Sequence, residues 1–182
     1  WHLAVHHSGV WCAASPGAGF AETEVYAKVM SDKEPPPWWE QKLFRWYDAT
    51  VYAGNLFNCS TIAYSGEIDP QKQSADLMEA AMAREGLHLE RRIGPQTAHK
   101  YEPVTRDKLA KDLETLVAKG RNPMPQEIRL TTYTLQYPEV AWLQLKGLEH
   151  HWDRADVRAS LERRDSVRLT TTNVSGIGLF VP

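Results

Sequence analysis

Two side chains that can do acid–base chemistry follow two strand-like runs in the middle of the chain. Asp69 comes just after STIAYSG at 60–66, and His99 comes just after LHLERRIG at 87–94. A neutral imidazole can take a proton from a hydroxyl near pH 7, and a carboxylate beside it fixes its tautomer and stabilises the imidazolium. Asp69 and His99 could therefore serve as the acid and the base of a catalytic triad. Glu67 is the rival acid, because it lies only two residues earlier.

The elements around these two residues alternate between strand and helix. Pro70 suits the start of a helix that ends near Gly86. Its inward stripe is made of apolar residues at helical spacing: Ala75, Leu77, Met78, Ala81 and Met82. Alternating strands and helices favour a parallel sheet covered on both faces, in which ligands bind beyond the carboxyl ends of the strands. Asp69 and His99 should therefore emerge on one rim of the sheet.

A further amphipathic helix is expected over TRDKLAKDLETLVAKG at 105–120. Thr105 fits its N-cap and Gly120 its end. The inward positions are Leu109, Leu113, Leu116 and Val117.

The tryptophan-rich segment at 38–58 also has helical spacing, with a predicted helix that ends near Gly54 and Asn55. Its tryptophans, Trp38, Trp39 and Trp46, could line a substrate cleft or pack against the sheet. Because tryptophan buries a large area wherever it can, we favour packing.

The pattern changes after Pro125. Three segments, at 127–148, 156–162 and 166–182, are rich in Thr, Val, Tyr and Leu with partial alternation. We expect residues 126–182 to form a small all-β unit, joined to the α/β unit at 1–122 by the linker GRNPMP.

The order of four segments carries a resemblance to a known family. WHLAVHH at 1–7, VWCAASPGAGF at 10–20, TIAYSGEIDPQKQ at 61–73 and GPQTAHKY at 94–101 resemble the carboxyl half of α/β-hydrolases of the prolyl oligopeptidase-like group. The resemblance covers about residues 1–120. It implies an α/β fold with part of a parallel sheet and flanking helices. It also implies a serine peptidase or esterase in which Asp69, the aspartate after the strand, is the acid and His99 is the base. In that family both residues follow the nucleophile along the chain.

In that family the nucleophilic serine lies in a G-x-S-x-G turn, and no such turn occurs in this sequence. Ser8, Ser65 and Ser175 each precede a glycine but lack the leading glycine. We expect the nucleophile to be encoded a few residues before Trp1, so that these 182 residues alone are inactive. Two alternatives stay open: a carbohydrate esterase of the same fold, and a hydrolase-like binding module that has lost its nucleophile.

Composition limits the partners. The 21 basic and 23 acidic residues form no basic stripe, so we expect a small-molecule or peptide substrate and no nucleic acid. No apolar run approaches the roughly 18 residues that a membrane span needs.

Cys12 and Cys59 lack metal or redox spacing, and we expect two buried thiols. The histidine pairs at 6–7 and 150–151 lack the i, i+4 spacing with which a helix binds zinc, so we expect no metal and no cofactor. A secreted or periplasmic location is favoured over a cytoplasmic one.

Overall fold

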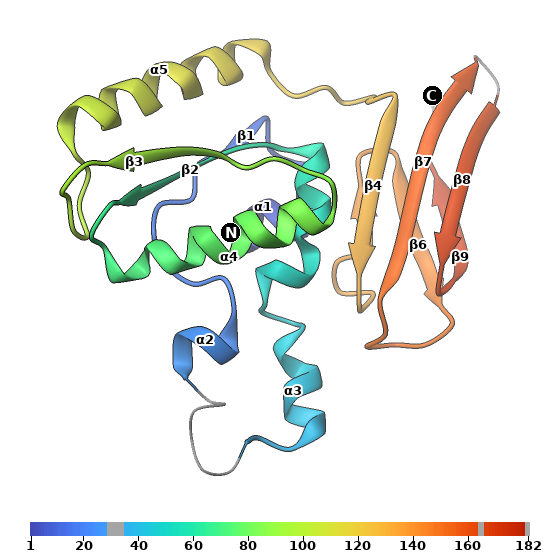
Figure 1. Ribbon diagram of the computed structural model, residues 1–182. Coiled ribbons are helices and arrows are strands. Elements are labelled where there is room, and N and C mark those ends of the chain that lie inside the picture. The colour runs from blue at the N-terminus through green and yellow to red at the C-terminus, as the bar shows by residue number, and fades with distance from the viewer. Residues whose placement is uncertain (29–34, 164–165, 181–182) are drawn as a thin grey trace.

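The computed structural model describes residues 1–28, 35–163 and 166–180. It is a mixed α/β structure with one parallel sheet and two antiparallel sheets. The parallel sheet has the strand order β1-β2-β3, formed by Ala13–Ala14, Ser60–Gly66 and Glu90–Gly94 (Figure 1). Both pairs of neighbouring strands are parallel, which confirms the expectation from the strand–helix alternation.

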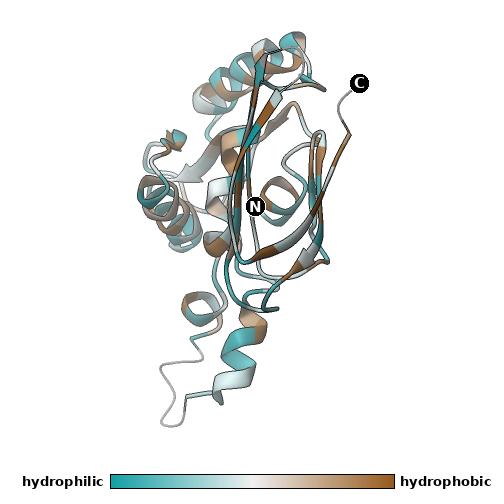
Figure 2. Cartoon of the chain, turned by 90° about the vertical axis from the view of Figure 1, so that its right-hand side faces the viewer, coloured by the Kyte–Doolittle hydropathy of each residue, from teal (hydrophilic) through white to brown (hydrophobic). Residues whose placement is uncertain are grey.

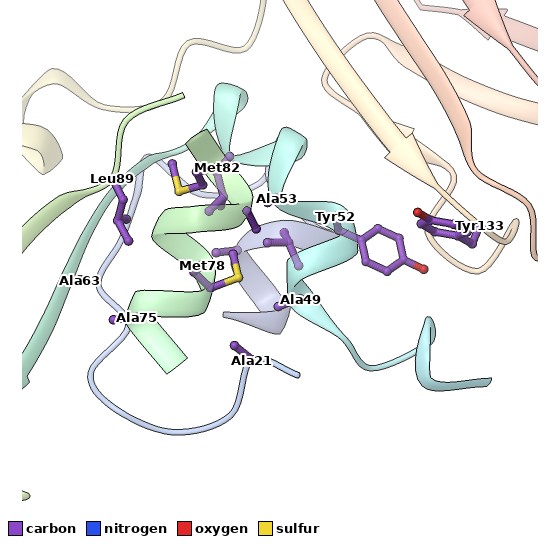
Figure 3. Close-up of a cluster of buried hydrophobic side chains, with 14 residues drawn as sticks. Ala21, Ala49, Tyr52, Ala53, Ala63, Ala75, Met78, Met82, Leu89 and Tyr133 are labelled. Atoms are coloured by element: carbon purple, nitrogen blue, oxygen red, sulfur yellow. The ribbon is translucent and has the colours of Figure 1, made fainter. Parts of the chain in front are cut away.

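Helices cover both faces of this sheet, as Figure 1 shows. Successive side chains of strand β2 lie on opposite faces of the sheet. Ile62 and Tyr64 pack against Leu109 of α5 (Pro103–Lys119). Ala63 of β2 instead joins the cluster that contains α4 (Gln73–Arg84) and α1 (His2–His6). Figure 3 shows this cluster, in which the small and flexible side chains of α4 meet Leu89. The two faces of β2 therefore carry two separate apolar clusters, one under each helix.

Helix α5 differs from the prediction at its start and at one inward position. Its N-cap is Glu102, whose carboxylate accepts hydrogen bonds from the backbone N–H groups of Val104 and Thr105, so Thr105 is not the cap. Pro103 takes the first helical position, where a missing N–H costs nothing. Val117 is 59% exposed rather than inward, because the buried stripe of α5 is narrower than the sequence pattern suggested.

The single helix predicted from Trp38 to near Gly54 and Asn55 is wrong, since the structure divides this segment into two. Helix α3 covers Trp38–Phe44, and the 3-10 helix η1 covers Ala49–Asn58. Asp48 lies between them with an extended backbone. Its carboxylate accepts hydrogen bonds from the backbone N–H and the hydroxyl of Thr23, at the start of α2 (Thr23–Ala27). This contact stabilises the extended backbone that separates the two helices.

The preferred placement of the tryptophans is also wrong. Trp38, Trp39 and Trp46 are 70%, 52% and 40% exposed, so they do not pack against the sheet. Neither α2 nor α3 contains a buried residue. Together these two helices form an arm that projects away from the sheet (Figures 1 and 2).

The rest of the chain forms the expected β-rich part. One antiparallel sheet has the order β4-β7-β8, with bounds Glu127–Thr132, Ala155–Arg163 and Ser166–Thr172. The other has the order β5-β6-β9, with bounds Glu139–Val140, Leu143–Leu148 and Val174–Leu179. Both sheets contribute to one apolar cluster centred on Trp142, which is 2% exposed. Within the described residues, no strand pair joins this part to the parallel sheet.

The β-rich part nevertheless packs directly on the α/β part. Tyr133, just after β4, belongs to the apolar cluster of the α/β part and lies at one end of it in Figure 3. Its ring meets the ring of Tyr52 in η1 with centroids 5.5 Å apart. Of the two cysteines, Cys59 is buried and Cys12 is half-buried, and both are free thiols.

Candidate active site

Asp69 and His99 meet at the carboxyl end of the parallel sheet. Nδ1 of His99 lies 2.9 Å from Oδ2 of Asp69, so the predicted contact between these two side chains is confirmed. The other carboxylate oxygen, Oδ1, accepts a hydrogen bond of 2.9 Å from the backbone N–H of Gln71. Asp69 holds this position because it caps the short 3-10 helix η2 (Pro70–Lys72) that follows β2. Both oxygens of the carboxylate therefore have fixed partners.

Burial divides the pair into a supporting group and an accessible one. The side chain of Asp69 is 3% exposed, whereas that of His99 is 65% exposed. A buried carboxylate exerts a stronger electrostatic effect than an exposed one because less water screens it. The buried carboxylate of Asp69 therefore orients the accessible imidazole of His99, as a histidine that acts as a general base requires.

The rival acid, Glu67, does not contact the histidine. Its Oε2 accepts a hydrogen bond of 2.7 Å from the backbone N–H of Gln96, in the loop that leads to His99. Gln96 has a positive φ of 48°, which lets the chain turn at this point. Glu67 therefore supports the histidine loop, and Asp69 is the carboxylate that meets the imidazole.

A close crossing of two loops brings the pair together. The backbone N–H of Ile68 donates to the carbonyl of Thr97 (3.1 Å), and that of Glu67 donates to the carbonyl of Gly94 (2.9 Å). A Cβ at Gly66 would overlap the carbonyl oxygens of Thr97 and Ala98. Only glycine lets the histidine loop lie this close to the acid's strand. The sequence reasoning missed this role, although Gly66 stands at the strand end where such a crossing has to occur.

The pair lies in a pocket of about 230 Å³. Its walls come from the loop after β1, from β2 and from the histidine loop: Gly17, Ala18, Tyr64, Ser65, Asp69, His99, Lys100 and Tyr101. The tyrosine rings have their centroids 4.4 Å apart. No described residue hydrogen-bonds Nε2 of His99, so this nitrogen is free to act on a group placed in the pocket. Apart from Asp69 and His99, the sequence reasoning found none of these lining residues, because their proximity depends on the way the loops fold.

Ser65 is the one serine in the pocket lining, and its surroundings do not suit a nucleophile. It is 1% exposed, and its hydroxyl lies 3.4 Å from Nη2 of Arg91. No hydrogen bond joins Ser65 to His99. Within the described residues, the candidate acid and base are therefore present, but no hydroxyl or thiol forms a hydrogen bond with Nε2 of His99.

Other histidines show no sign of a metal centre. His6 is buried between the rings of Tyr137 and Tyr52, with centroids 3.8 and 4.3 Å away. Burial, together with the nearby His2 and His7, lowers the pKa of His6 to about 3. Among residues 1–28, 35–163 and 166–180, no three His, Cys, Asp or Glu side chains gather as metal ligands would.

No helix in the same ranges is long and apolar enough to span a membrane.

Comparisons with protein-family models, with curated proteins and with solved structures find no match. The geometry of the site is therefore the basis for a function, since a fold class alone does not determine an activity.

Proposed function

We propose that this chain is the acid-and-histidine part of a serine hydrolase of the α/β-hydrolase type, acting on peptides or esters. Asp69 is the acid, His99 is the general base, and the nucleophile comes from a segment outside these 182 residues. The hydrogen bond between Nδ1 of His99 and the buried carboxylate of Asp69, at a histidine that lines a pocket, is the observation that carries the proposal.

The chemistry follows from this geometry. Nε2 of His99 takes the proton of the serine hydroxyl as the oxygen attacks the substrate carbonyl, and Asp69 stabilises the resulting imidazolium. The imidazolium then donates its proton to the leaving amine or alcohol as the scissile bond breaks. In the second half of the cycle, His99 takes a proton from water as the water attacks the acyl-enzyme. The imidazolium then returns this proton to the serine oxygen as the acid is released. Asp69 keeps Nδ1 protonated throughout, so that Nε2 is the nitrogen that exchanges the proton.

Comparing the chain with a form extended before Trp1 tests the proposal. Residues 1–182 alone should neither hydrolyse an acyl-4-nitrophenyl ester nor react with a fluorophosphonate, whereas the extended form should do both. His99→Ala in the extended form should reduce turnover at least about 10³-fold. His88→Ala, at a side chain 83% exposed elsewhere on the surface, is the matched control and should have no effect. Labelling of a serine within residues 1–182, or an inert extended form, would contradict the proposal.

A carbohydrate esterase is the second candidate, favoured by the exposed tryptophans of the arm. Trp38 and Trp39 of α3 are 70% and 52% exposed, so they present aromatic surface on which sugar rings can stack. The arm begins a few residues after Gly17 and Ala18, which line the pocket of His99. A short segment of chain therefore connects the wall of the pocket to the arm.

This alternative is tested by co-sedimentation of the chain with insoluble xylan, cellulose and chitin. Binding that is lost in Trp38→Ala and Trp39→Ala but kept in Trp11→Ala would favour the esterase, because Trp11 is 41% exposed outside the arm. Cleavage by the extended form of a proline-type peptide, with no binding to any of the three polysaccharides, would favour the peptidase.

A further inference from the structure

The hydroxyl of Tyr64 connects strand β2 to the loop that carries His99. It donates a hydrogen bond of 3.0 Å to the carbonyl of Lys100 and accepts one of 2.7 Å from the backbone N–H of Glu102. These two groups lie on either side of Tyr101, within three residues of His99. We propose that Tyr64 is a positioning residue, which holds the backbone of this loop so that His99 keeps its contact with Asp69 and its direction into the pocket.

The environment of Tyr64 fixes the place of this hydroxyl. The residue is 4% exposed, and its ring packs with Ile62 and Leu109 under α5. Gly94 makes room for the hydroxyl, because a Cβ there would overlap the tyrosine oxygen. A ring held on several sides cannot move its hydroxyl to follow a displaced loop. The loop must therefore adapt to Tyr64.

His99 depends on its backbone for orientation. It stands at the centre of a tight turn in which the N–H of Lys100 donates to the carbonyl of Ala98 (2.8 Å). Its side chain is 65% exposed, and Asp69 is its one hydrogen-bond partner among the described residues. Few contacts hold the imidazole itself, so a shift of the Lys100 peptide would move the ring away from the carboxylate.

The backbone of Tyr64 fixes the opposite wall of the same pocket. Its N–H donates to the carbonyl of Pro16 (2.9 Å), and its carbonyl accepts from the N–H of Ala18 (3.3 Å). Gly17, between these two residues, lies against the ring of Tyr101. One residue of β2 thus connects both sides of the pocket, and its hydroxyl is the part that acts on the histidine side.

The proposal predicts a specific loss in Tyr64→Phe, measured on this chain by NMR. Removing the hydroxyl leaves the carbonyl of Lys100 and the N–H of Glu102 without a partner. The Glu102 amide should exchange with deuterium about tenfold faster. The resonance of the His99 Nδ1 proton, visible when its bond to Asp69 slows exchange with water, should broaden or disappear. Amides of the β-rich part should keep their protection, which shows that the variant is folded.

Two further variants keep the test decisive. Tyr101→Phe is the matched control, because the Tyr101 hydroxyl makes no hydrogen bond within the described structure, and it should leave both readouts unchanged. In Gly94→Ala the added methyl group would overlap the Tyr64 hydroxyl and also press on Cβ of Glu102, so this variant should displace the same loop and weaken the Nδ1 resonance of His99. Wild-type Glu102 exchange and an unchanged Nδ1 resonance in Tyr64→Phe would overturn the proposal.

The catalytic consequence rests on the proposed function and is measured separately. In the extended form, Tyr64→Phe should lower kcat about tenfold with little change in KM. The NMR readouts need no activity, so an inert extended form would reject the hydrolase while leaving the positioning role to be judged by the Nδ1 and Glu102 signals.

Discussion

Asn55 and Thr131 form a two-way amide pair in the buried contact between η1 and β4. Nδ2 of Asn55 donates to the carbonyl of Thr131 (2.9 Å), and Oδ1 accepts from the Thr131 N–H (2.6 Å). Asn58, one turn later, makes the same two bonds to the backbone of Arg129. These side chains imitate a neighbouring strand along the free edge of β4. They connect the β-rich part to the α/β part through backbone groups that would otherwise be unpaired.

Asn55→Ala should therefore destabilise the whole chain. The substitution leaves the N–H and carbonyl of Thr131, and the carbonyl of Val5, without their partner. Buried groups of this kind cost about 1–3 kcal/mol each, and we expect a total loss of about 3 kcal/mol. Urea unfolding followed by circular dichroism measures it. Asn122→Ala, at an exposed asparagine, is the control and should change stability by less than about 0.5 kcal/mol. Equal effects of the two substitutions would contradict this account of the contact.

A second prediction concerns acid and His6. Burial, with the charges of His2 and His7, lowers the pKa of His6 to about 3 in the folded chain, against an ordinary value near 6.5. The unfolded chain then binds the extra proton below pH 6.5, so stability falls as the pH drops from about 6.5 toward 3. Between pH 6.5 and 5 the loss should be about 2 kcal/mol.

His6→Phe tests this prediction. Phenylalanine keeps an aromatic ring between Tyr52 and Tyr137 but cannot be protonated. Thermal unfolding at several pH values should show that the variant loses less stability than the wild type between pH 6.5 and 5. His151→Phe, at an exposed histidine, should leave the wild-type pH dependence in place. An unchanged pH dependence in His6→Phe would show that other groups cause the acid sensitivity.

The position of the candidate site followed from the sequence because parallel strands end on the same rim. Asp69 and His99 each follow a strand, and one helix separates those strands, so their proximity needed no knowledge of side-chain contacts. The choice between Asp69 and Glu67 was different. It depends on two backbone N–H groups, of Gln71 and Gln96, which direct one carboxylate to the imidazole and the other to the loop. Hydrophobic periodicity contains no information on such contacts.

Two features of the fold that the sequence did not predict have a common physical origin. Helical spacing in the tryptophan-rich segment predicted one helix to near Gly54, yet the chain is extended at Asp48, whose carboxylate binds Thr23, a residue 25 positions earlier. The edge of β4 is paired by asparagine side chains from η1, although nothing near β4 in sequence indicates it. In both places a long-range polar contact prevails over local propensity, and a single sequence does not show which residues will meet.

A third prediction tests the crossing at Gly66. In Gly66→Ala the added methyl group would overlap the carbonyl oxygens of Thr97 and Ala98, so the histidine loop has to move away from β2. We expect a loss of about 2 kcal/mol in unfolding free energy and a weaker bond between His99 and Asp69, seen in the Nδ1 proton resonance. Gly176→Ala is the control, because its Cβ would find ordinary contacts of 3.4 Å or more. A Gly66→Ala protein with normal stability and a normal resonance would mean that the crossing is not tight.

The last prediction separates the two carboxylates by their effect on turnover. In the form extended before Trp1, Asp69→Asn should keep the fold, because an amide of the same shape can still accept the hydrogen bond from Gln71. It would no longer stabilise the imidazolium or hold the required tautomer of His99, so kcat should fall by about 10⁴-fold. Glu67→Gln is the matched control, since Glu67 binds Gln96 and not the histidine. Its kcat should stay within a few-fold of the wild type. Near-normal turnover in Asp69→Asn would remove Asp69 from the mechanism, and a large loss only in Glu67→Gln would assign the acid to Glu67, through a movement of the histidine loop.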